Sequence, residues 1–198
     1  GDISVVSFHA TKVFNTFEGG LLVAPSREMK EKIDNLKNFG FVDETTVIES
    51  GLNGKMSEFN AAVGLLQLTH LDDIITRRGE RDALYRELLE PLHGIHCIEP
   101  IRQVRRNFAY FPILVGKDCK QARNQLYETL KRHDIFPRRY FHPLISEFPM
   151  YRSCPSASPS NLPVATDVSQ RVICLPMYPD LEETDVRRIC DVVQAATQ

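Results

Sequence analysis

The sequence lacks an excess of positive charge, a long apolar run and any paired arrangement of cysteines. Its 198 residues include 24 Lys and Arg against 26 Asp and Glu, so nothing favours the binding of a nucleic acid. No apolar run approaches the length of about eighteen residues that a membrane-spanning helix needs, so we expect no membrane span. The five cysteines stand singly, which is typical of reduced thiols and predicts a cytoplasmic protein without a disulfide framework.

The composition is that of a folded chain. Hydrophobic residues make up 42% and charged residues 25%, and a chain of this length buries more than half of its unfolded surface. Apolar runs at 3–8 and 20–24 predict two strands. Ser26 is a typical N-cap for the helix that follows, which Gly40 can close as its C′ residue. Strand, loop, strand and helix in this order indicate an α/β layer.

A second helix, of about thirty-five residues, is predicted from Ser57 onward because apolar residues recur there at helical spacing. Its first half is apolar on most faces, as in a buried helix, and past Arg77 it becomes charged and its apolar face narrows. A helix that changes character midway usually crosses from one domain to another. We therefore predict one domain at 1–76 and a small carboxyl-terminal α/β domain at 77–198.

The predicted second domain also alternates strands and helices. Its strand 107–115 carries Pro112, which places the strand at an edge or ends its pairing there. Asp118 is the expected cap of the next helix, and the Pro- and Ser-rich segment 150–163 predicts a surface loop. A final helix is expected to begin at Asp180, with a capping-box glutamate three residues on. Its predicted apolar face consists of Val186, Ile189, Cys190 and Val193.

The stretch S-F-H-A-T-K (7–12), followed by E-G-G (18–20), is the most informative for chemistry. A lysine in a loop directly after a buried strand can be partly desolvated, and a desolvated amine is a better nucleophile toward carbonyl groups. Ser7 offers a hydroxyl that could bind a phosphate, and the two glycines let backbone come close to a ligand. On spacing alone, Lys12 also suits an ordinary solvated lysine beside a glycine turn.

Three further segments extend this pattern along the chain: G-L-N-G-K-M-S-E-F (51–59), P-R-R-Y-F-H-P-L (137–144) and L-P-M-Y-P (175–179). Together with the lysine stretch, and in this order, they resemble the DegT/DnrJ/EryC1/StrS family. Its members are fold-type I aminotransferases that depend on pyridoxal phosphate (PLP) and act on nucleotide-linked keto sugars. The four segments cover nearly the whole chain, so the resemblance is specific.

The resemblance implies a role for each residue of the candidate cofactor site. Lys12 would form the Schiff base with PLP and then act as general base in the proton shift. Ser7 matches a serine whose hydroxyl contacts the cofactor phosphate. Asn53 matches an asparagine that reaches this phosphate from the neighbouring subunit, so the active site would be shared across a homodimer. His9 matches a frequent family histidine and is assigned to the substrate, with packing at the strand end as its alternative role.

The resemblance is looser on the sugar side of the site. Tyr140 falls where many relatives carry a histidine near the sugar, so the contact could come from Tyr140, from His142 or from neither. Gly54 and Lys55 stand where an aromatic residue and an arginine are commoner, and a lysine does not bind a diphosphate as an arginine fork does. The sequence is most similar to relatives that use dTDP-linked 3- or 4-keto-6-deoxyhexoses, with glutamate as the amino donor.

The first matching segment, which contains Lys12, lies near the middle of the usual family sequence. The resemblance therefore implies that the chain is the carboxyl-terminal half of such an enzyme, made of the end of a fold-type I large domain and a small α/β lobe. The aspartate that pairs with the pyridine nitrogen would lie in the other half, so we expect the isolated chain to be weakly active or inactive. The implied pathway makes sugars for surface polysaccharides or glycosides. The alternative is a non-catalytic dimerisation fragment without a complete cofactor site.

Two other groups of residues favour structural roles. His93, His96 and Cys97 lack a second ligand pair at metal-site spacing, so a surface loop is favoured and no metal is expected. The short basic cluster at 102–106 predicts a solvated turn.

Overall fold

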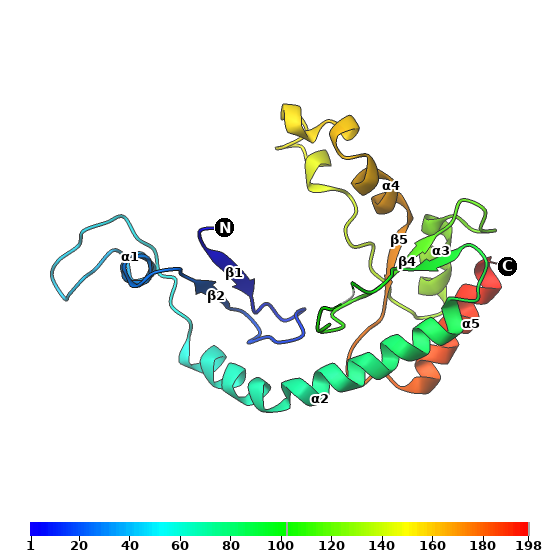
Figure 1. The fold of residues 1–198 in the computed structure, drawn as a ribbon, viewed down its shortest axis with the longest axis horizontal. Coiled ribbons are helices and arrows are strands. Elements are labelled where there is room, and N and C mark those ends of the chain that lie inside the picture. The colour runs from blue at the N-terminus through cyan, green and yellow to red at the C-terminus, as the bar shows by residue number, and fades with distance from the viewer. Residues whose placement is uncertain (102, 198) are drawn as a thin grey trace. The chain divides into compact units, whose positions relative to one another are not determined.

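The chain forms two compact units in the computed structural model, which describes residues 1–101 and 103–197. Unit 1 comprises Gly1–Asp73 and unit 2 comprises Ile74–Gln198 (Figure 1). The division falls inside the long helix α2 (Glu58–Leu89), the element that the sequence predicts to run from one domain into the next. The assignment of 1–76 to a cofactor-binding large domain and of 77–198 to a small carboxyl-terminal domain stays a prediction.

Unit 1 opens with an antiparallel hairpin, as the two apolar runs predict. Strand β1 (Ser4–Ser7) pairs with β2 (Gly20–Val23), and the register sets Ser7 opposite Gly20. Helix α1 (Arg27–Lys37) follows, and its predicted N-cap is confirmed because the Ser26 hydroxyl accepts a hydrogen bond from the Met29 N–H at 3.1 Å. The hairpin therefore brings the two ends of loop 8–19 together.

The end of α1 differs by one residue from the prediction. Asn38 is the C-cap, Phe39 takes the left-handed conformation at C′ with φ +60°, and Gly40 follows with φ +84°. The Gly40 N–H donates to the Asn35 carbonyl at 2.8 Å, which satisfies one of the last carbonyls of the helix. A Cβ at Gly40 would lie 1.8 Å from the Glu49 carbonyl oxygen, so glycine is required by close packing as well as by φ.

Helix α2 has 32 residues, which corresponds to about 48 Å at 1.5 Å per residue. Ser57 caps it, because the Ser57 hydroxyl accepts from the Asn60 N–H at 3.2 Å. The prediction that its first half is buried is wrong for this chain, since Phe59, Leu65 and Leu66 are 68%, 70% and 62% exposed. Amphipathic spacing does not say what covers each face. Several of the less exposed positions follow one face of the helix, among them Asn60, Gly64, Gln67, Leu71 and Ile74.

Unit 2 is built on a three-stranded antiparallel sheet in the order β3-β4-β5. Its strands are β3 (Ile95–Cys97), β4 (Phe111–Val115) and β5 (Val172–Leu175). Its core joins the sheet to the second half of α2, to α3 (Arg123–Arg132) and to α5 (Glu183–Thr197). The fully buried residues of this core include Tyr85, Leu89, Phe111, Ile113, Leu126, Leu130, Ile173, Val186 and Val193.

Short helices lie in and around the predicted surface loop 150–163 of unit 2, with η2 and η3 inside it. Three single-turn helices, η1 (Ile145–Glu147), η2 (Pro155–Ala157) and η3 (Pro159–Asn161), are followed by α4 (Pro163–Arg171), which leads into β5. The first residues of the segment are exposed, as predicted. Sequence reasoning missed α4 and β5. All four residues of β5 are buried, and so short an apolar run has no period to distinguish it.

Pro112 lies in the central strand and not at an edge. It stands opposite Cys174 of β5. The Cys174 N–H donates to the Arg138 carbonyl at 2.7 Å and the Cys174 carbonyl accepts from the Arg138 N–H at 2.9 Å, so both backbone groups of Cys174 point away from β4. The pair Pro112–Cys174 is therefore one that exchanges no ladder bonds, and the missing proline N–H faces the side of β3. Pairing with β3 stops at Ile113, so the second alternative holds: Pro112 ends the pairing on that side.

Two helix caps and one residue of the basic cluster depart from the predictions, while residues 103–105 of that cluster are exposed as expected. Helix α3 begins after Ala122, whose N–H donates to the Gln125 side chain at 3.1 Å, and not at Asp118. Helix α5 begins at Glu183, and Asp180 instead pairs with Arg77 at 2.7 Å, while the predicted apolar face of α5 is buried as expected. In the basic cluster, Arg102 lies outside the described residues, and Arg106 bonds the buried carboxylate of Asp82.

Candidate functional site

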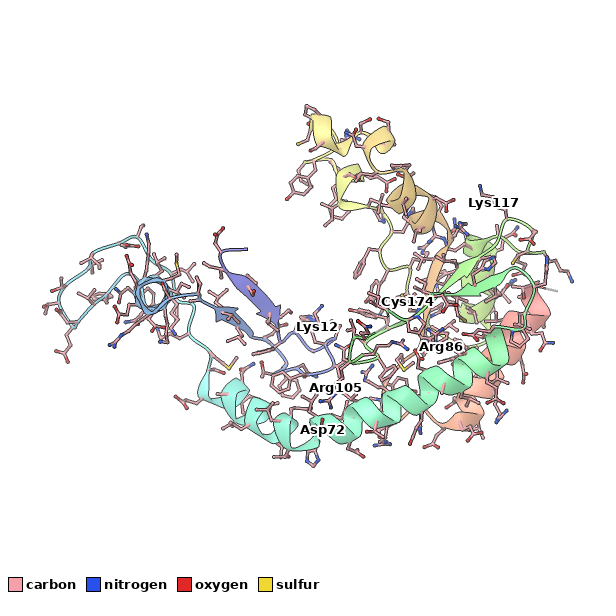
Figure 2. All side chains as sticks on the ribbon, in the orientation of Figure 1. Lys12, Asp72, Arg86, Arg105, Lys117 and Cys174 are labelled. Atoms are coloured by element: carbon pink, nitrogen blue, oxygen red, sulfur yellow. The ribbon has the colours of Figure 1, made fainter. Side chains whose placement is uncertain are left out.

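Lys12 lies in the loop that joins the two strands of the hairpin in unit 1 (Figure 2). The loop is closed at its base, because the Phe8 N–H donates to the Gly19 carbonyl and the Thr16 N–H donates to the Phe8 carbonyl, each at 2.9 Å. The Lys12 N–H donates to the His9 carbonyl at 2.9 Å, which turns the chain at the lysine. The side chain of Lys12 is half-buried. The loop therefore presents the amine from a fixed backbone.

His9 shares this loop with Lys12, and Ser7 is the last residue of β1, directly before the loop. The His9 N–H donates to the Ser7 hydroxyl at 3.3 Å. The Nδ1 atom of His9 accepts from the Thr11 N–H at 3.2 Å, which places the ring proton of the neutral form on Nε2. Nε2 lies 3.7 Å from the Glu18 carboxylate. The His9 side chain is 49% exposed, so simple packing at the strand end does not describe it.

Asn53 lies elsewhere in unit 1, on the segment that runs along the carboxyl end of α1. It forms a bridge with Asn38, and the next residue, Gly54, donates to the Lys37 carbonyl at 2.8 Å. Asn53 itself is exposed. The Lys55 amine bonds the Asn38 side chain at 3.1 Å and lies 4.5 Å from the centre of the Phe39 ring. These contacts tie Asn53 to the end of α1, and its role at a partner's cofactor stays a prediction.

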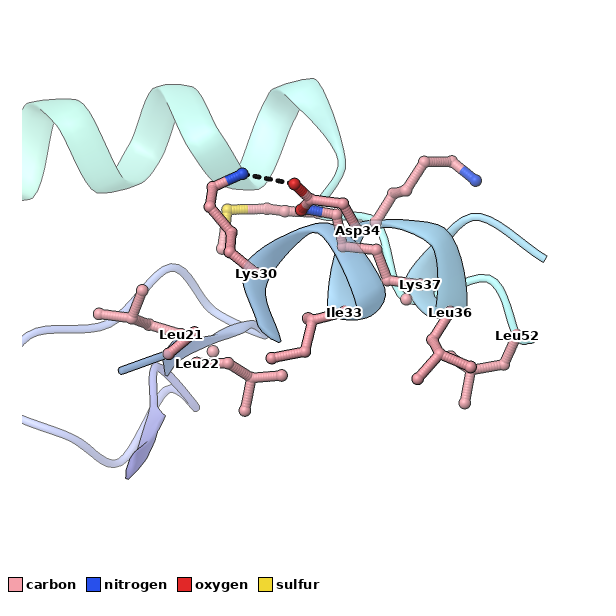
Figure 3. A pocket seen from close by; sticks show the side chains of 13 residues that line it. Leu21, Leu22, Lys30, Ile33, Asp34, Leu36, Lys37 and Leu52 are labelled. Carbon is pink, nitrogen blue, oxygen red and sulfur yellow. Dashed lines mark hydrogen bonds and ion pairs between the residues drawn. The ribbon is translucent and has the colours of Figure 1, made fainter. Parts of the chain in front are cut away.

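A cavity of about 640 Å³ in unit 1 is separate from the lysine loop. It is lined by β2, α1 and the segment that contains Leu52 (Figure 3). Leucine and isoleucine side chains form one side of it, and Lys30 and Lys37 reach the Asp34 carboxylate at its edge. Hydrogen bonds from these two lysines lower the pKa of Asp34. Ser7, His9 and Lys12 are not among the lining residues, so the cavity does not contain the predicted chemistry.

The predicted sugar-side residues lie in unit 2, on the segment whose Arg138 bridges to β5. The Tyr140 ring meets the Tyr110 ring edge to face at 5.5 Å and stacks on Phe141 at 4.6 Å. His142 is half-buried, and its Nδ1 atom is buried without a hydrogen-bond partner among the described residues. Burial lowers the pKa of His142, and the positive charges of Arg123 and Arg139 add to the effect. The sugar contact could therefore still come from Tyr140, from His142 or from neither residue.

The depressed pKa of His142 predicts a pH-dependent stability of the chain. The folded state favours the neutral ring, so its stabilising contribution is present above the ordinary value of 6.5 and is lost as pH falls through the folded pKa. We expect the urea midpoint to drop between about pH 7 and pH 5, and His142→Gln to flatten this part of the profile. His93→Gln, at an exposed histidine of the same unit, is the matched control. An equal slope in His142→Gln and the unaltered chain would contradict the assignment.

Sequence reasoning missed two residues that hold the lysine loop, Thr16 and Asn60. Thr16 is 2% exposed, and the Asn60 side chain donates to the loop carbonyls of Thr16 and Glu18 at 2.6 and 2.7 Å. The available signal was weak: Asn60 follows the N-cap Ser57 by three residues, where a capping box places a polar side chain. That pattern concerns the helix and says nothing of a loop more than forty residues earlier in the chain.

The remaining candidate groups add no chemistry. His93 pairs with Asp118 at 3.2 Å on the surface. Within residues 1–101 and 103–197, no group of three or more His, Cys, Asp or Glu side chains is arranged to hold a metal ion. Across the same residues, no helix combines the length and the apolar character that crossing a membrane requires.

Sequence comparison gives one family and several relatives. Residues 1–194 match the model of the DegT/DnrJ/EryC1/StrS aminotransferase family. The chain is 47% identical to a dTDP-4-amino-4,6-dideoxy-D-glucose transaminase of Shigella dysenteriae, over 98% of the chain and 52% of that protein. It is 49% identical to a transaminase of the same description from Escherichia coli, over 87% of the chain and 47% of that protein. The chain thus spans about half the length of the curated relatives it matches.

Structural comparison gives the same fold class as the sequence resemblance. The chain superposes on DesI, solved in the presence of its TDP-sugar product, with a TM-score of 0.85 and 32% identity, covering 98% of the chain and 49% of DesI. It superposes on the Helicobacter pylori aminotransferase PseC with a TM-score of 0.89, covering 100% of the chain and 53% of PseC; at 24% identity this likeness concerns the fold alone. The chain thus matches about half of the length of each of these two solved proteins. The predicted α/β fold class is confirmed.

Proposed function

The chain belongs to the DegT/DnrJ/EryC1/StrS aminotransferase family, and from this premise we propose that the protein containing it transfers an amino group from glutamate to a nucleotide-linked keto sugar. The sugar is a dTDP-linked keto-6-deoxyhexose. The observation that carries the proposal is the 47% identity, over 98% of the chain, to a transaminase whose name contains a dTDP-linked 4-amino-4,6-dideoxy sugar. The amino sugar formed would serve surface-polysaccharide or glycoside biosynthesis in the cytoplasm.

The residues of the lysine loop suit PLP, the cofactor that the family uses. PLP presents an aldehyde and a phosphate, and Lys12 in the loop and Ser7 at the end of β1 offer an amine and a hydroxyl five positions apart. The Ser7 hydroxyl accepts from the His9 N–H and can still donate its own hydrogen to a phosphate oxygen. The donor set therefore fits the group. When bound, PLP supplies an electron sink for the bond changes at the amine-bearing carbon.

The chain's own residues would then do three things. The Lys12 Nζ atom holds the cofactor and, once released from it, moves a proton at the substrate carbon that carries nitrogen. Ser7 orients the phosphate. Asn53, exposed on a segment away from the lysine loop, donates to the phosphate held by a second subunit, which supports a homodimer with shared sites. On the sugar side, Tyr140 and His142 are both candidates for the contact with the substrate.

The proposed function is tested by a direct assay of amino transfer. We expect the full-length protein, loaded with PLP, to convert dTDP-4-keto-6-deoxyglucose and glutamate into the amino sugar nucleotide and 2-oxoglutarate in equal amounts, measured by mass spectrometry. The 3-keto isomer is the matched control for the ring position. The isolated 198-residue chain should show weak activity or none. A full-length protein that binds PLP yet forms neither amino sugar would contradict the proposed reaction.

The alternative of a non-catalytic dimerisation fragment makes a different prediction for the same samples. The exposed apolar residues Phe59, Leu65 and Leu66 favour association of the chain through α2. Such a fragment would associate and yet trap no PLP after borohydride reduction, whether or not the rest of the enzyme is present. One PLP trapped on Lys12 in the full-length protein would exclude this alternative.

A further inference from the structure

We propose that Asn60 is a positioning residue for the amino-transfer reaction, because its side chain fastens the Lys12 loop to the first turn of α2 and so sets where the lysine amine stands. The inference rests on the proposed function for the role of Lys12. The fastening itself rests on contacts inside unit 1 alone.

The amide of Asn60 is fully used in this contact. Its Nδ2 atom lies 2.6 Å from the Thr16 carbonyl oxygen and 2.7 Å from the Glu18 carbonyl oxygen. Carbonyl oxygens only accept, so both amide hydrogens must point at the loop. On the other side, the Oδ1 atom of Asn60 meets the hydroxyl of Ser57, which already accepts from the Asn60 N–H and therefore donates here. The helix cap thus fixes the orientation of the amide.

The loop side of the contact is equally well ordered. The buried Thr16 hydroxyl donates to the Glu18 carbonyl at 2.7 Å, and the Glu18 N–H donates to the Thr16 carbonyl at 2.9 Å. Each of the two carbonyls that Asn60 binds therefore also accepts a hydrogen bond from within the loop. Next to them, the Asn15 side chain donates to the Lys12 carbonyl at 3.3 Å. Asn60, the Thr16 turn and Asn15 form a continuous chain of contacts that ends at the lysine.

The shape of α2 matches the loop around these hydrogen bonds. A Cβ at Gly64, one turn after Asn60, would lie 2.8 Å from the Thr16 methyl group, so only glycine lets the helix come this close without a shift. The Phe59 ring stacks on Phe17 of the loop at 6.1 Å. The loop is thus held by an amide whose hydrogen-bonding groups are all used, by close packing at Gly64 and by an aromatic stack. Together these contacts keep the loop in one place, which is what a reactive lysine requires.

The fastening is tested first without the cofactor, by hydrogen exchange on the full-length protein. Asn60→Asp keeps the shape of the side chain but replaces the NH2 group, which donates both hydrogen bonds, by a carboxylate oxygen that repels the two carbonyls. We expect the amides of segment 8–19 to exchange about tenfold faster or more, with α5 unchanged. Thr16→Val, which removes a single hydroxyl bond, should have a smaller effect. Asn161→Asp, at an exposed asparagine that also donates to a carbonyl, is the matched control.

The positioning role is tested by the rate at which PLP becomes fixed to Lys12 on borohydride reduction, and by kcat and KM for glutamate. We expect Asn60→Asp to slow the labelling of Lys12 and to lower kcat, each about tenfold, with KM changed much less. A merely structural contact would lower the yield of folded protein and leave both rates per folded molecule unchanged.

The outcomes separate this inference from the proposed function. Unchanged exchange at 8–19 in Asn60→Asp overturns the fastening, and faster exchange with an unchanged labelling rate overturns the positioning role. If Asn60→Asp exchanges fast throughout the chain, it has unfolded, and Asn60→Ala, which removes the same two hydrogen bonds without adding a charge, decides by the same two readouts. If the unaltered full-length protein fixes no PLP at Lys12, the proposed function fails, while exchange at 8–19 still decides whether Asn60 holds the loop.

Discussion

Replacing Lys12 with arginine is expected to abolish covalent capture of PLP and to lower amino transfer in the full-length protein by about 10⁴-fold or more. Arginine keeps the positive charge and the approximate length of the side chain. Its guanidinium stays protonated, so it is neither a nucleophile toward an aldehyde nor a base toward a carbon-bound proton. The backbone of the loop should survive, because the bonds at its base involve main-chain atoms and Asn60. The measurement is the mass of the protein after borohydride reduction, followed by peptide mapping.

The control for this prediction is another lysine of unit 1. Lys32, exposed on α1 at 3.8 Å from the Glu49 carboxylate, can be replaced by arginine with little effect on capture or rate. Capture that moves to several lysines, or that persists in Lys12→Arg at full rate, would show that the reactive amine lies elsewhere. A Lys12→Ala variant then reports whether the charge of Lys12 matters apart from its nucleophilicity.

Local signals were enough to predict the elements of unit 1. Ser26 and Ser57 begin their helices as N-caps because their hydroxyls satisfy backbone N–H groups, a requirement that is visible in the sequence itself. The end of α1 was missed by one residue, because Phe39 takes a left-handed conformation that the sequence assigns to Gly40. In unit 2, Asp118 and Asp180 looked like caps, yet their carboxylates pair with His93 and Arg77. Such pairings join distant parts of the chain and leave no local pattern.

The candidate site shows the same division between local and distant information. The stretch that contains Ser7, His9 and Lys12 is contiguous, so its motif was readable, and the structure places the three residues at the end of β1 and in the loop that follows it. Asn60 belongs to the same assembly but is 44 residues from Thr16, so nothing near it in the sequence marks the contact. Apolar spacing likewise predicted that the first half of α2 is buried, and Leu65 is 70% exposed here. A pattern indicates which face needs a partner, and only the structure shows whether this chain provides one.

Replacing Asp82 with alanine is expected to destabilise the chain by about 3–5 kcal/mol, because it leaves the Arg106 guanidinium without its carboxylate and leaves Arg86 with Glu90 as its remaining partner. The Asp82 side chain is 5% exposed. Its carboxylate accepts from Arg106 at 3.0 and 2.6 Å, a two-point contact, and from Arg86 at 2.9 Å. Arg86 also donates to the Ile98 carbonyl at 2.8 Å. Because Ile98 and Arg106 both belong to the segment between β3 and β4, the Asp82 carboxylate and its two arginines tie this segment to α2.

The size of this effect depends on burial, which a matched surface pair makes measurable. Glu183 and Arg187 on α5 form a similar contact at 2.7 Å, but their side chains are 64% and 50% exposed, so Glu183→Ala should cost no more than about 1 kcal/mol. Urea unfolding followed by far-UV circular dichroism measures both variants. Arg106→Ala should cost less than Asp82→Ala, because Arg106 is partly exposed and Arg86 remains to neutralise the carboxylate. Equal losses of stability in Asp82→Ala and Glu183→Ala would contradict a stabilising role for the buried network. In the double variant, a departure of about 1–3 kcal/mol from the sum of the Asp82→Ala and Arg106→Ala effects would show that the two groups act through their mutual contact.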